Sequence, residues 1–172
     1  MSDNPDELFD VVNADDRVVG RARRADVHAR RLLHRAVHTL VQRGNGDIFL
    51  QKRSMEKDTH PGRWDSSSSG HLDSGEDYGS AALRELGEEL GIHLEALEQI
   101  GSVPASRDTD YEFVRIYLTR HEGPFILHPT EISDGKWVSI SQLRKWLEEE
   151  PEDFPKCFHV VWKEVASHFA ES

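Results

Sequence analysis

The residues best suited to chemistry lie close together in residues 70–92, which read GHLDSGEDYGSAALRELGEELGI. On a helix that turns 100° per residue, Glu85, Glu88 and Glu89 occupy an arc of roughly 100°. The apolar side chains of this segment fall on a different face, formed by Ala82, Leu83, Leu86 and Leu90. One side of the helix can therefore pack against a core while the other presents three carboxylates.

Carboxylates gathered in this way need a positive charge nearby, because like charges at i,i+4 cost a few tenths of a kcal/mol each. Arg84 stands four residues before Glu88 and can form an ion pair with it. Clustered oxygen ligands also suit Mg²⁺, with Mn²⁺ as an alternative ion. Such an ion would neutralise phosphate oxygens and help to generate hydroxide from water, so the segment predicts a divalent-metal site.

The element that must position these carboxylates is a helix over residues 77–90. Gly91 follows it where a left-handed cap residue is expected. Gly70 and Gly75 lie in the expected loop before the helix, where a positive φ or a close backbone approach to a ligand favours glycine. Gly87 is unusual, since a glycine inside a helix costs about 1 kcal/mol relative to alanine. Either a neighbouring segment passes close to Gly87 or the position is simply suboptimal.

A glutamate-rich helix is more often a solvated acidic face than a catalytic one, and spacing decides between these interpretations. The segment has a specific spacing between Gly70, Glu76 and the residues from Arg84 to Ile92. From typical residue frequencies, a match by chance is on the order of one in ten million for a chain of this size. The spacing therefore favours function.

The flanking elements are expected to form a mixed sheet between helices, in one α/β domain over residues 1–172. A short N-terminal hairpin is expected over 8–12 and 17–21, and a longer one over 34–43 and 47–52, turning at 44–46. Further strands are expected at 111–119 and 136–140. Ser141 is expected to cap a short helix that runs through Glu149, and a C-terminal amphipathic helix is expected over 156–169.

Composition limits the classes of partner. The formal net charge of -11 argues against generic nucleic-acid binding, which depends on a basic surface. The same charge would repel a polyphosphate, so an anionic substrate requires a bound cation, basic side chains or both at the site. We expect no membrane span or export signal. Cys157, the single cysteine, excludes an internal disulfide and a cysteine-built zinc site, and fits a cytoplasmic location.

At residues 70–92 the sequence resembles the Nudix family, whose signature box it matches at every specified position. Weaker resemblance extends from about residue 8 to about residue 140. The resemblance implies an α/β/α sandwich, and hydrolysis of a nucleoside diphosphate linked to another moiety by water attack at phosphorus with divalent metals. It also implies that Glu85, Glu88 and Glu89 are metal ligands, that Arg84 orients a glutamate, and that Gly70 and Glu76 are supporting residues.

The general base varies within this family, and the sequence leaves it open. Glu88 and Glu85 inside the box are candidates. Glu112 and Glu131 outside the box are the others.

The segments around the box resemble one branch, the isopentenyl-diphosphate isomerases and similar hydrolases. The resemblance implies metal ligation by His28, His34, His71, Asp110 and Glu112, with Glu89 as the acidic ligand within the box. It implies diphosphate binding by Arg24, Arg53 and Lys57. Two departures argue against isomerase activity: Ser69 stands where the isomerase has its proton-transferring cysteine, and Glu85 stands where it has a basic residue.

Most isolated histidines are structural or surface residues, so the others are assigned no role. Trp64 is expected to pack in the core rather than to stack on a base. The leading hypothesis is a Mg²⁺-dependent hydrolase of a phosphoanhydride in a diphosphate-containing small molecule. The alternatives are an isomerase in which Ser69 or another group replaces the thiol, and a diphosphate-binding regulatory module with low turnover. The sequence specifies neither the substrate nor the oligomeric state.

Overall fold

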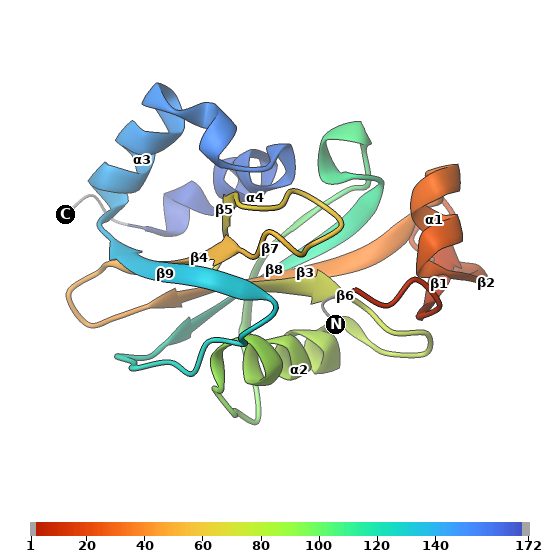
Figure 1. Ribbon diagram of the computed structural model, residues 1–172, viewed down its shortest axis with the longest axis horizontal. Helices are drawn as coiled ribbons and strands as arrows, with labels where there is room; N and C mark the ends of the chain where they lie inside the picture. The colour runs from red at the N-terminus through yellow and green to blue at the C-terminus, as the bar shows by residue number, and fades with distance from the viewer. Residues whose placement is uncertain (1–2, 170–172) are drawn as a thin grey trace.

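A computed structural model describes residues 3–169 and shows a mixed sheet between two layers of helices (Figure 1). Its strand order is β5-β4-β3-β8-β7, with β6 paired to β3 and β9 paired to β4. The strands are β3 (His34–Gln42), β4 (Ile48–Arg53), β5 (Trp64–Asp65), β6 (Ser68–His71), β7 (Glu98–Val103), β8 (Glu112–Arg120) and β9 (Ile132–Val138). β3 and β8 are parallel and the other pairs are antiparallel, which confirms the expected mixed sheet.

The helices cover the two faces of this sheet unequally. In Figure 1, α2 (Tyr78–Leu90) lies below the sheet, and α3 (Ile140–Glu149) and α4 (Lys156–Val165) lie above it. β1 (Leu8–Val12) and β2 (Val18–Arg23) form the expected hairpin as a separate two-stranded sheet beside α1 (Arg24–Arg30). The α/β/α sandwich is confirmed. None of the helices within residues 3–169 has the length and apolar character needed to cross a membrane.

Alternation along β3 divides the core into two parts. Ala36 and Leu40 belong to the cluster that includes the α3 and α4 side chains, whereas Val37 and Val41 pack with residues of α2. Successive side chains of a strand point to opposite faces. His34 and His38 share the parity of Ala36, so both imidazoles face the α4 side.

Register extends this arrangement to neighbouring strands. β8 runs parallel to β3 with Glu112 beside His34, and β6 runs antiparallel with His71 opposite Ala36. Residues opposite one another in a sheet point to the same face. Glu112 and His71 therefore join the β3 histidines on one face, while Gly70 faces α2.

The two ends of α2 lie within one residue of the predicted range, 77–90. The Asp77 carboxylate accepts a hydrogen bond from the Ser80 amide at 2.9 Å, and Gly91 adopts a left-handed conformation with φ of 71°. Gly75 also has a positive φ, of 82°. The close approach considered for Gly87 is present, because a Cβ there would lie 3.1 Å from the His93 ring.

Several local predictions are corrected. Gly70 lies in β6 and not in a loop, because β6 pairs with β3 through Ser68 to His71. Ser139 rather than Ser141 caps α3, its hydroxyl accepting from the Gln142 amide at 3.1 Å. The C-terminal helix ends at Val165 and a 3₁₀ turn follows it. Four elements were not expected from the sequence, because they are short, serine-rich or largely exposed: α1, β5, β6 and β7.

Candidate active site

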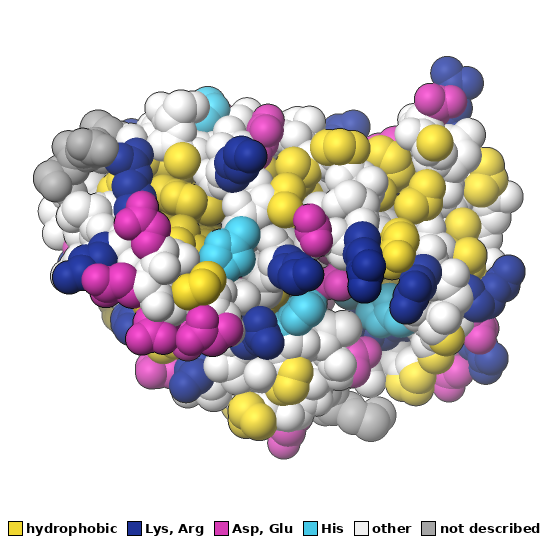
Figure 2. Space-filling model, turned by 90° about the horizontal axis from the view of Figure 1, so that it is seen from above, with side chains coloured by type: hydrophobic (Ala, Val, Ile, Leu, Met, Phe, Trp, Pro, Cys, Tyr) yellow, Lys and Arg dark blue, Asp and Glu magenta, His cyan; other side chains and the backbone are white. Residues whose placement is uncertain are grey.

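A cavity of about 390 Å³ lies between α1, β6, α2 and α4 and brings residues from both ends of the chain together. Among residues 3–169, nine Asp and Glu side chains line it against five Lys and Arg side chains. On the face seen from above, Lys, Arg and His side chains form a band across the molecule, with acidic side chains among them and gathered at its left end (Figure 2). A cavity with this excess of carboxylates attracts cations before it can accept an anion.

The three glutamates of α2 face this cavity at different depths. A Cβ added at Gly70 would overlap the Glu85 carboxylate, so glycine lets β6 pass over that side chain without displacing it. Glu89 is 5% exposed and accepts hydrogen bonds from the Gln51 amide group and the Ser69 backbone amide. Glu88 is more open, with 57% of its side chain exposed. We call these three residues the carboxylate face.

Arg84 links the carboxylate face to the loop before α2. Its Nε and Nη2 donate to the two oxygens of Glu76 at 2.9 Å each. Its Nη1 donates to Glu85 at 2.7 Å and to Glu88 at 3.3 Å, so the predicted Arg84–Glu88 ion pair is present. The Nη2 atom also donates to the backbone oxygen of His71 at 3.0 Å. One guanidinium thus fixes the position of three carboxylates.

This guanidinium does not compensate all the buried negative charge. Burial raises the pKa of Glu85 to about 7 despite the charge of Arg84. Burial and the neighbouring Glu85 charge raise the pKa of Glu89 well above its usual range, although hydrogen bonds from Gln51 and Ser69 oppose this. A divalent ion held by oxygen ligands supplies the missing positive charge, so the carboxylate face fits Mg²⁺ or Mn²⁺.

A second group of ligands lies at the other end of the cavity, and we call His28, His34, His71 and Glu112 the histidine end. The three imidazoles each offer a nitrogen within 4.8 Å of the others. His71 Nε2 lies 2.8 Å from Glu112 Oε1, and His34 Nε2 lies 3.5 Å from the same oxygen. His34 Nδ1 donates to the Leu32 carbonyl at 2.8 Å, which leaves its buried Nε2 without a hydrogen-bond partner.

The protonation of the histidine end suits metal binding. Burial lowers the pKa of His71 to about 4 against the opposing charge of Glu112, so this imidazole is neutral at pH 7. Burial and the nearby Arg24 charge lower the pKa of His28. Burial opposes ionisation of Glu112, but its contacts with His71 and His34 hold its pKa well below the usual range. Neutral imidazoles around an ionised carboxylate are the form that ligates a metal.

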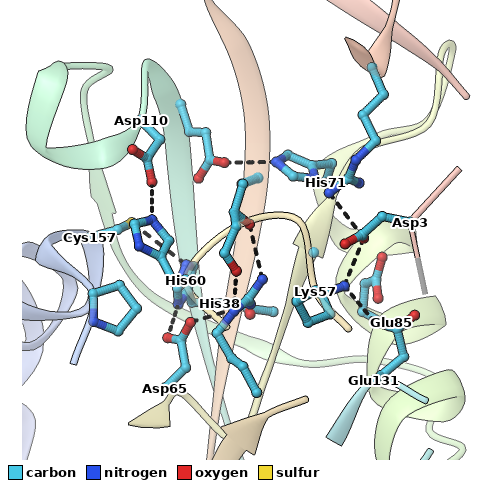
Figure 3. Close-up of a pocket in the computed structure, with 18 of the residues that line it drawn as sticks. Asp3, His38, Lys57, His60, Asp65, His71, Glu85, Asp110, Glu131 and Cys157 are labelled. Atoms are coloured by element: carbon cyan, nitrogen blue, oxygen red, sulfur yellow. Dashed lines mark hydrogen bonds and ion pairs between the residues drawn. The ribbon is translucent and has the colours of Figure 1, made fainter. Parts of the chain in front are cut away.

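The predicted diphosphate-binding residues line the cavity but are already paired with acids. Arg24 donates to both oxygens of Asp58 at 3.0 Å and lies 3.0 Å from Asp3. Lys57 contacts Asp3 at 2.8 Å and Glu131 at 2.5 Å (Figure 3). A phosphate that enters must replace these carboxylates as the partner of the basic groups.

Arg53 is also held by groups of the protein itself. Its guanidinium donates to the Thr59 backbone oxygen at 3.0 Å and to the Thr59 hydroxyl at 3.1 Å. It also lies 3.6 Å from Asp65. These contacts support a structural role beside the role in substrate binding that the sequence predicted.

Sequence interpretation placed some cavity residues elsewhere or missed them. Asp110, predicted as a metal ligand, contacts His60 at 2.7 Å and does not join the three imidazoles. Asp3, His38 and Cys157 line the cavity although the sequence assigned them no role. Alternation along β3 places His38 on the same face of the strand as Ala36. The sequence alone does not show which face of β3 is buried on the α4 side, so it did not assign His38 to the cavity. Trp64 is 8% exposed and packs in the core, as predicted.

The family model described as NUDIX domain matches residues 32–157. The chain is 32% identical over 161 residues to "Isopentenyl-diphosphate Delta-isomerase 2" of Photorhabdus laumondii, covering 91% of this chain and 90% of that one. It is 33% identical over 140 residues to a protein of Deinococcus radiodurans named "Nudix hydrolase", covering 80% and 82%. A crystal structure from the same organism superposes with a TM-score of 0.76 at 31% identity, covering 84% and 90%.

Proposed function

This chain belongs to the Nudix family of hydrolases, and we propose that it cleaves a phosphoanhydride bond in a small molecule that contains a nucleoside diphosphate. Water is the nucleophile and phosphorus is the centre attacked. The observation that carries the proposal is the hydrogen-bond network of Arg84, which links Glu76 to Glu85 and Glu88 at the wall of an acidic cavity. Carboxylates fixed in this way hold a metal ion and a water molecule in a defined geometry.

Magnesium is the proposed cofactor, with Mn²⁺ as an alternative, and Glu85, Glu88 and Glu89 are its proposed ligands. When bound, the ion supplies charge neutralisation of phosphate oxygens and lowers the pKa of water. Arg84 keeps Glu85 in place through the contact at 2.7 Å. Gly70 leaves the space that the Glu85 carboxylate occupies.

Glu88 is the proposed general base. It is the most exposed glutamate of the carboxylate face, and it contacts Arg84 at 3.3 Å. The competing candidates are engaged elsewhere: Glu112 contacts His71 at 2.8 Å and Glu131 contacts Lys57 at 2.5 Å. A base must be free to accept a proton from water, and Glu88 meets that condition best.

The basic residues of the cavity would bind the substrate's phosphates. Arg24 and Lys57 both contact Asp3, which also lines the cavity. Both can exchange this carboxylate for phosphate oxygens, and Arg53 adds positive charge from β4. Three basic side chains at one side of the proposed metal site can bind the oxygens of two linked phosphates.

The test is phosphate or nucleotide release from a panel of nucleoside diphosphate derivatives, with Mg²⁺ and with excess chelator. We expect turnover of at least one derivative in Mg²⁺ and at least a roughly 10²-fold loss when the ion is removed. Turnover that is unchanged in chelator contradicts the assignment of the metal. No release from any derivative contradicts the hydrolase proposal.

Isomerisation of isopentenyl diphosphate is the second candidate, because close relatives carry the name of that enzyme and the histidine end is well formed. Ser69 weakens this candidate, since a hydroxyl is a much weaker acid than a thiol. Incorporation of solvent deuterium into isopentenyl diphosphate tests it directly. If neither activity is found, nucleotide binding measured by calorimetry tests the remaining candidate, a regulatory module.

A further inference from the structure

A third group of ligand atoms lies in the cavity, beside the two groups already described. His38 of β3, Glu112 of β8 and Cys157 of α4 each offer one ligand atom within 4.8 Å of the others. Cys157 and His38 lie together on one side of the cavity, across from Lys57 and Glu85 (Figure 3). His38 is 4% exposed and Cys157 is 6% exposed, so their polar atoms are shielded from bulk water.

The imidazole of His38 is held in a fixed orientation. Its Nδ1 lies 2.8 Å from the Ser66 hydroxyl and 3.7 Å from Asp65 Oδ1. Asp65 is in turn 3.6 Å from the Arg53 guanidinium, which keeps the carboxylate in place. A carboxylate and a hydroxyl near one ring nitrogen favour the proton on that nitrogen. His38 Nε2 then presents its lone pair toward Cys157.

The spacing of the ligand atoms suits a tetrahedral ion. His38 Nε2 and Cys157 Sγ are 3.8 Å apart. In a tetrahedral zinc site, sulfur at about 2.3 Å and nitrogen at about 2.05 Å from the metal are separated by about 3.6 Å. The pair therefore needs little movement, and Glu112 offers a carboxylate oxygen within 4.8 Å of both atoms as the third ligand.

Packing alone does not explain this arrangement. Cys157 belongs to the core cluster, where a small apolar residue would fill the same space. A core position does not require a histidine oriented by Ser66 and Asp65 at the sulfur, nor a partly buried carboxylate near it. These are the features of a metal ligand with a supporting second layer of hydrogen bonds.

We propose that His38, Glu112 and Cys157 bind a zinc-like divalent ion, with the fourth coordination position open to the cavity. A thiolate and an imidazole select Zn²⁺ or Co²⁺ over Mg²⁺, which prefers the oxygen ligands of the carboxylate face. Binding forms a metal–sulfur bond and releases the thiol proton to solvent. Three protein ligands with one open position are the arrangement of zinc sites that act on a ligand rather than only stabilising the fold.

This site goes beyond the proposed hydrolysis, because metal binding here requires no substrate and no turnover. Glu112 is shared with the histidine end, where it contacts His71 at 2.8 Å. Cys157 and His28, by contrast, each belong to one group only. Substitution of Cys157 and of His28 therefore separates the two groups experimentally.

The test is titration of the full-length, metal-free protein with Co²⁺, followed by absorption spectroscopy, and with Zn²⁺, followed by calorimetry. A thiolate ligand gives an intense sulfur-to-cobalt charge-transfer band in the near ultraviolet, which oxygen and nitrogen ligands do not give. Since Cys157 is the only cysteine of the chain, such a band assigns the ligand without a variant. We expect this band in the wild-type protein, and its absence overturns the proposal.

Variants sharpen the result. Cys157→Ser is expected to abolish the band and to weaken Zn²⁺ binding by about 10-fold to 10²-fold, whereas His28→Gln is expected to retain the band. His38→Gln is expected to shift or weaken it. Persistence of the band in Cys157→Ser, or its loss in His28→Gln with the fold intact by circular dichroism, contradicts the site. Because these readouts involve no substrate, failure of the hydrolase proposal leaves them unaffected.

Discussion

The carboxylate face and the histidine end border the same cavity, yet they are built in different ways. Glu85, Glu88 and Glu89 come from five consecutive residues of α2, and a single arginine orients two of them. The four residues of the histidine end come from α1, β3, β6 and β8. A site encoded in one helix forms wherever that helix forms, whereas a site spread over four elements exists only when strand register is correct.

The two regions also differ in how folding changes their protonation. Burial raises the pKa of Glu85 to about 7, because the charged carboxylate loses water. Burial lowers the pKa of His71 to about 4, because the charged imidazole loses water. Near pH 7 the carboxylate face must release protons when a metal binds, while His71 is already neutral. One cavity thus holds two groups of candidate metal ligands that differ in their expected pH response and in ligand hardness.

The largest expected effect tests whether catalysis belongs to the carboxylate face. Glu88→Gln removes a metal ligand and the proposed base, so we expect the catalytic rate to fall by at least roughly 10²-fold. The measurement is steady-state turnover of the best substrate from the panel. Glu148→Gln on the exposed side of α3 is the matched control and should keep the wild-type rate. A wild-type rate in Glu88→Gln would remove the carboxylate face from the mechanism.

The next effect tests geometry rather than charge. Gly70→Ala places a Cβ where the Glu85 carboxylate lies, and this flexible side chain can move aside without unfolding the protein. We expect a loss of about 10-fold to 10²-fold in rate, since a displacement near 1 Å has that effect on catalysis. Gly20→Ala is the control, because nothing lies within 4 Å of a Cβ there. Equal rates in both variants would show that Glu85 does not depend on β6 for its position.

A third, smaller effect concerns pH. Glu85 has a folded pKa near 7 against a usual value of 4.5, so its protonated form favours folding. That contribution to the stability of the metal-free protein is present at low pH and is lost as pH rises through about 7. Mg²⁺ requires the ionised form, so its affinity should rise by about tenfold between pH 6 and pH 8.

Calorimetric titration with Mg²⁺ at the two pH values measures this directly, with Glu85→Gln as the variant that should weaken the dependence, while Glu89, whose pKa is also raised, keeps its own part of it. His71, with its pKa of about 4, stays neutral across the same interval and contributes no change. An affinity that does not vary with pH in the wild-type protein would mean that Glu85 is ionised before the metal arrives.

The smallest expected effect separates the stability of α2 from the geometry of its carboxylates. Gly87→Ala improves helix propensity, and the exposed His93 ring, 3.1 Å from the added Cβ, can move away. We expect the free energy of unfolding to rise by about 0.5 kcal/mol, less than the full propensity gain of about 1 kcal/mol. Urea denaturation measures it. A loss of stability would show that the His93 segment cannot yield.

Much of the carboxylate face could be predicted because its determinants are local. The Asp77 cap, the left-handed Gly91 and the i,i+4 contact from Arg84 to Glu88 depend on residues within one helix and its ends. Gly70 was placed in a loop because its strand is only four residues long and rich in serine. The close approach that favours glycine at this position comes from Glu85, fifteen positions away, and sequence spacing alone does not show it.

The sequence by itself determined the helix, its carboxylates and the kind of metal they suit, because these follow from a 3.6-residue period and from ligand chemistry. Only the tertiary structure decided that Glu112 lies beside His34, that Asp3 neutralises Arg24, and that Cys157 meets His38. Those contacts depend on strand register and on which face α4 covers, and both are set by burial across the whole domain. Local residue patterns do not contain that information.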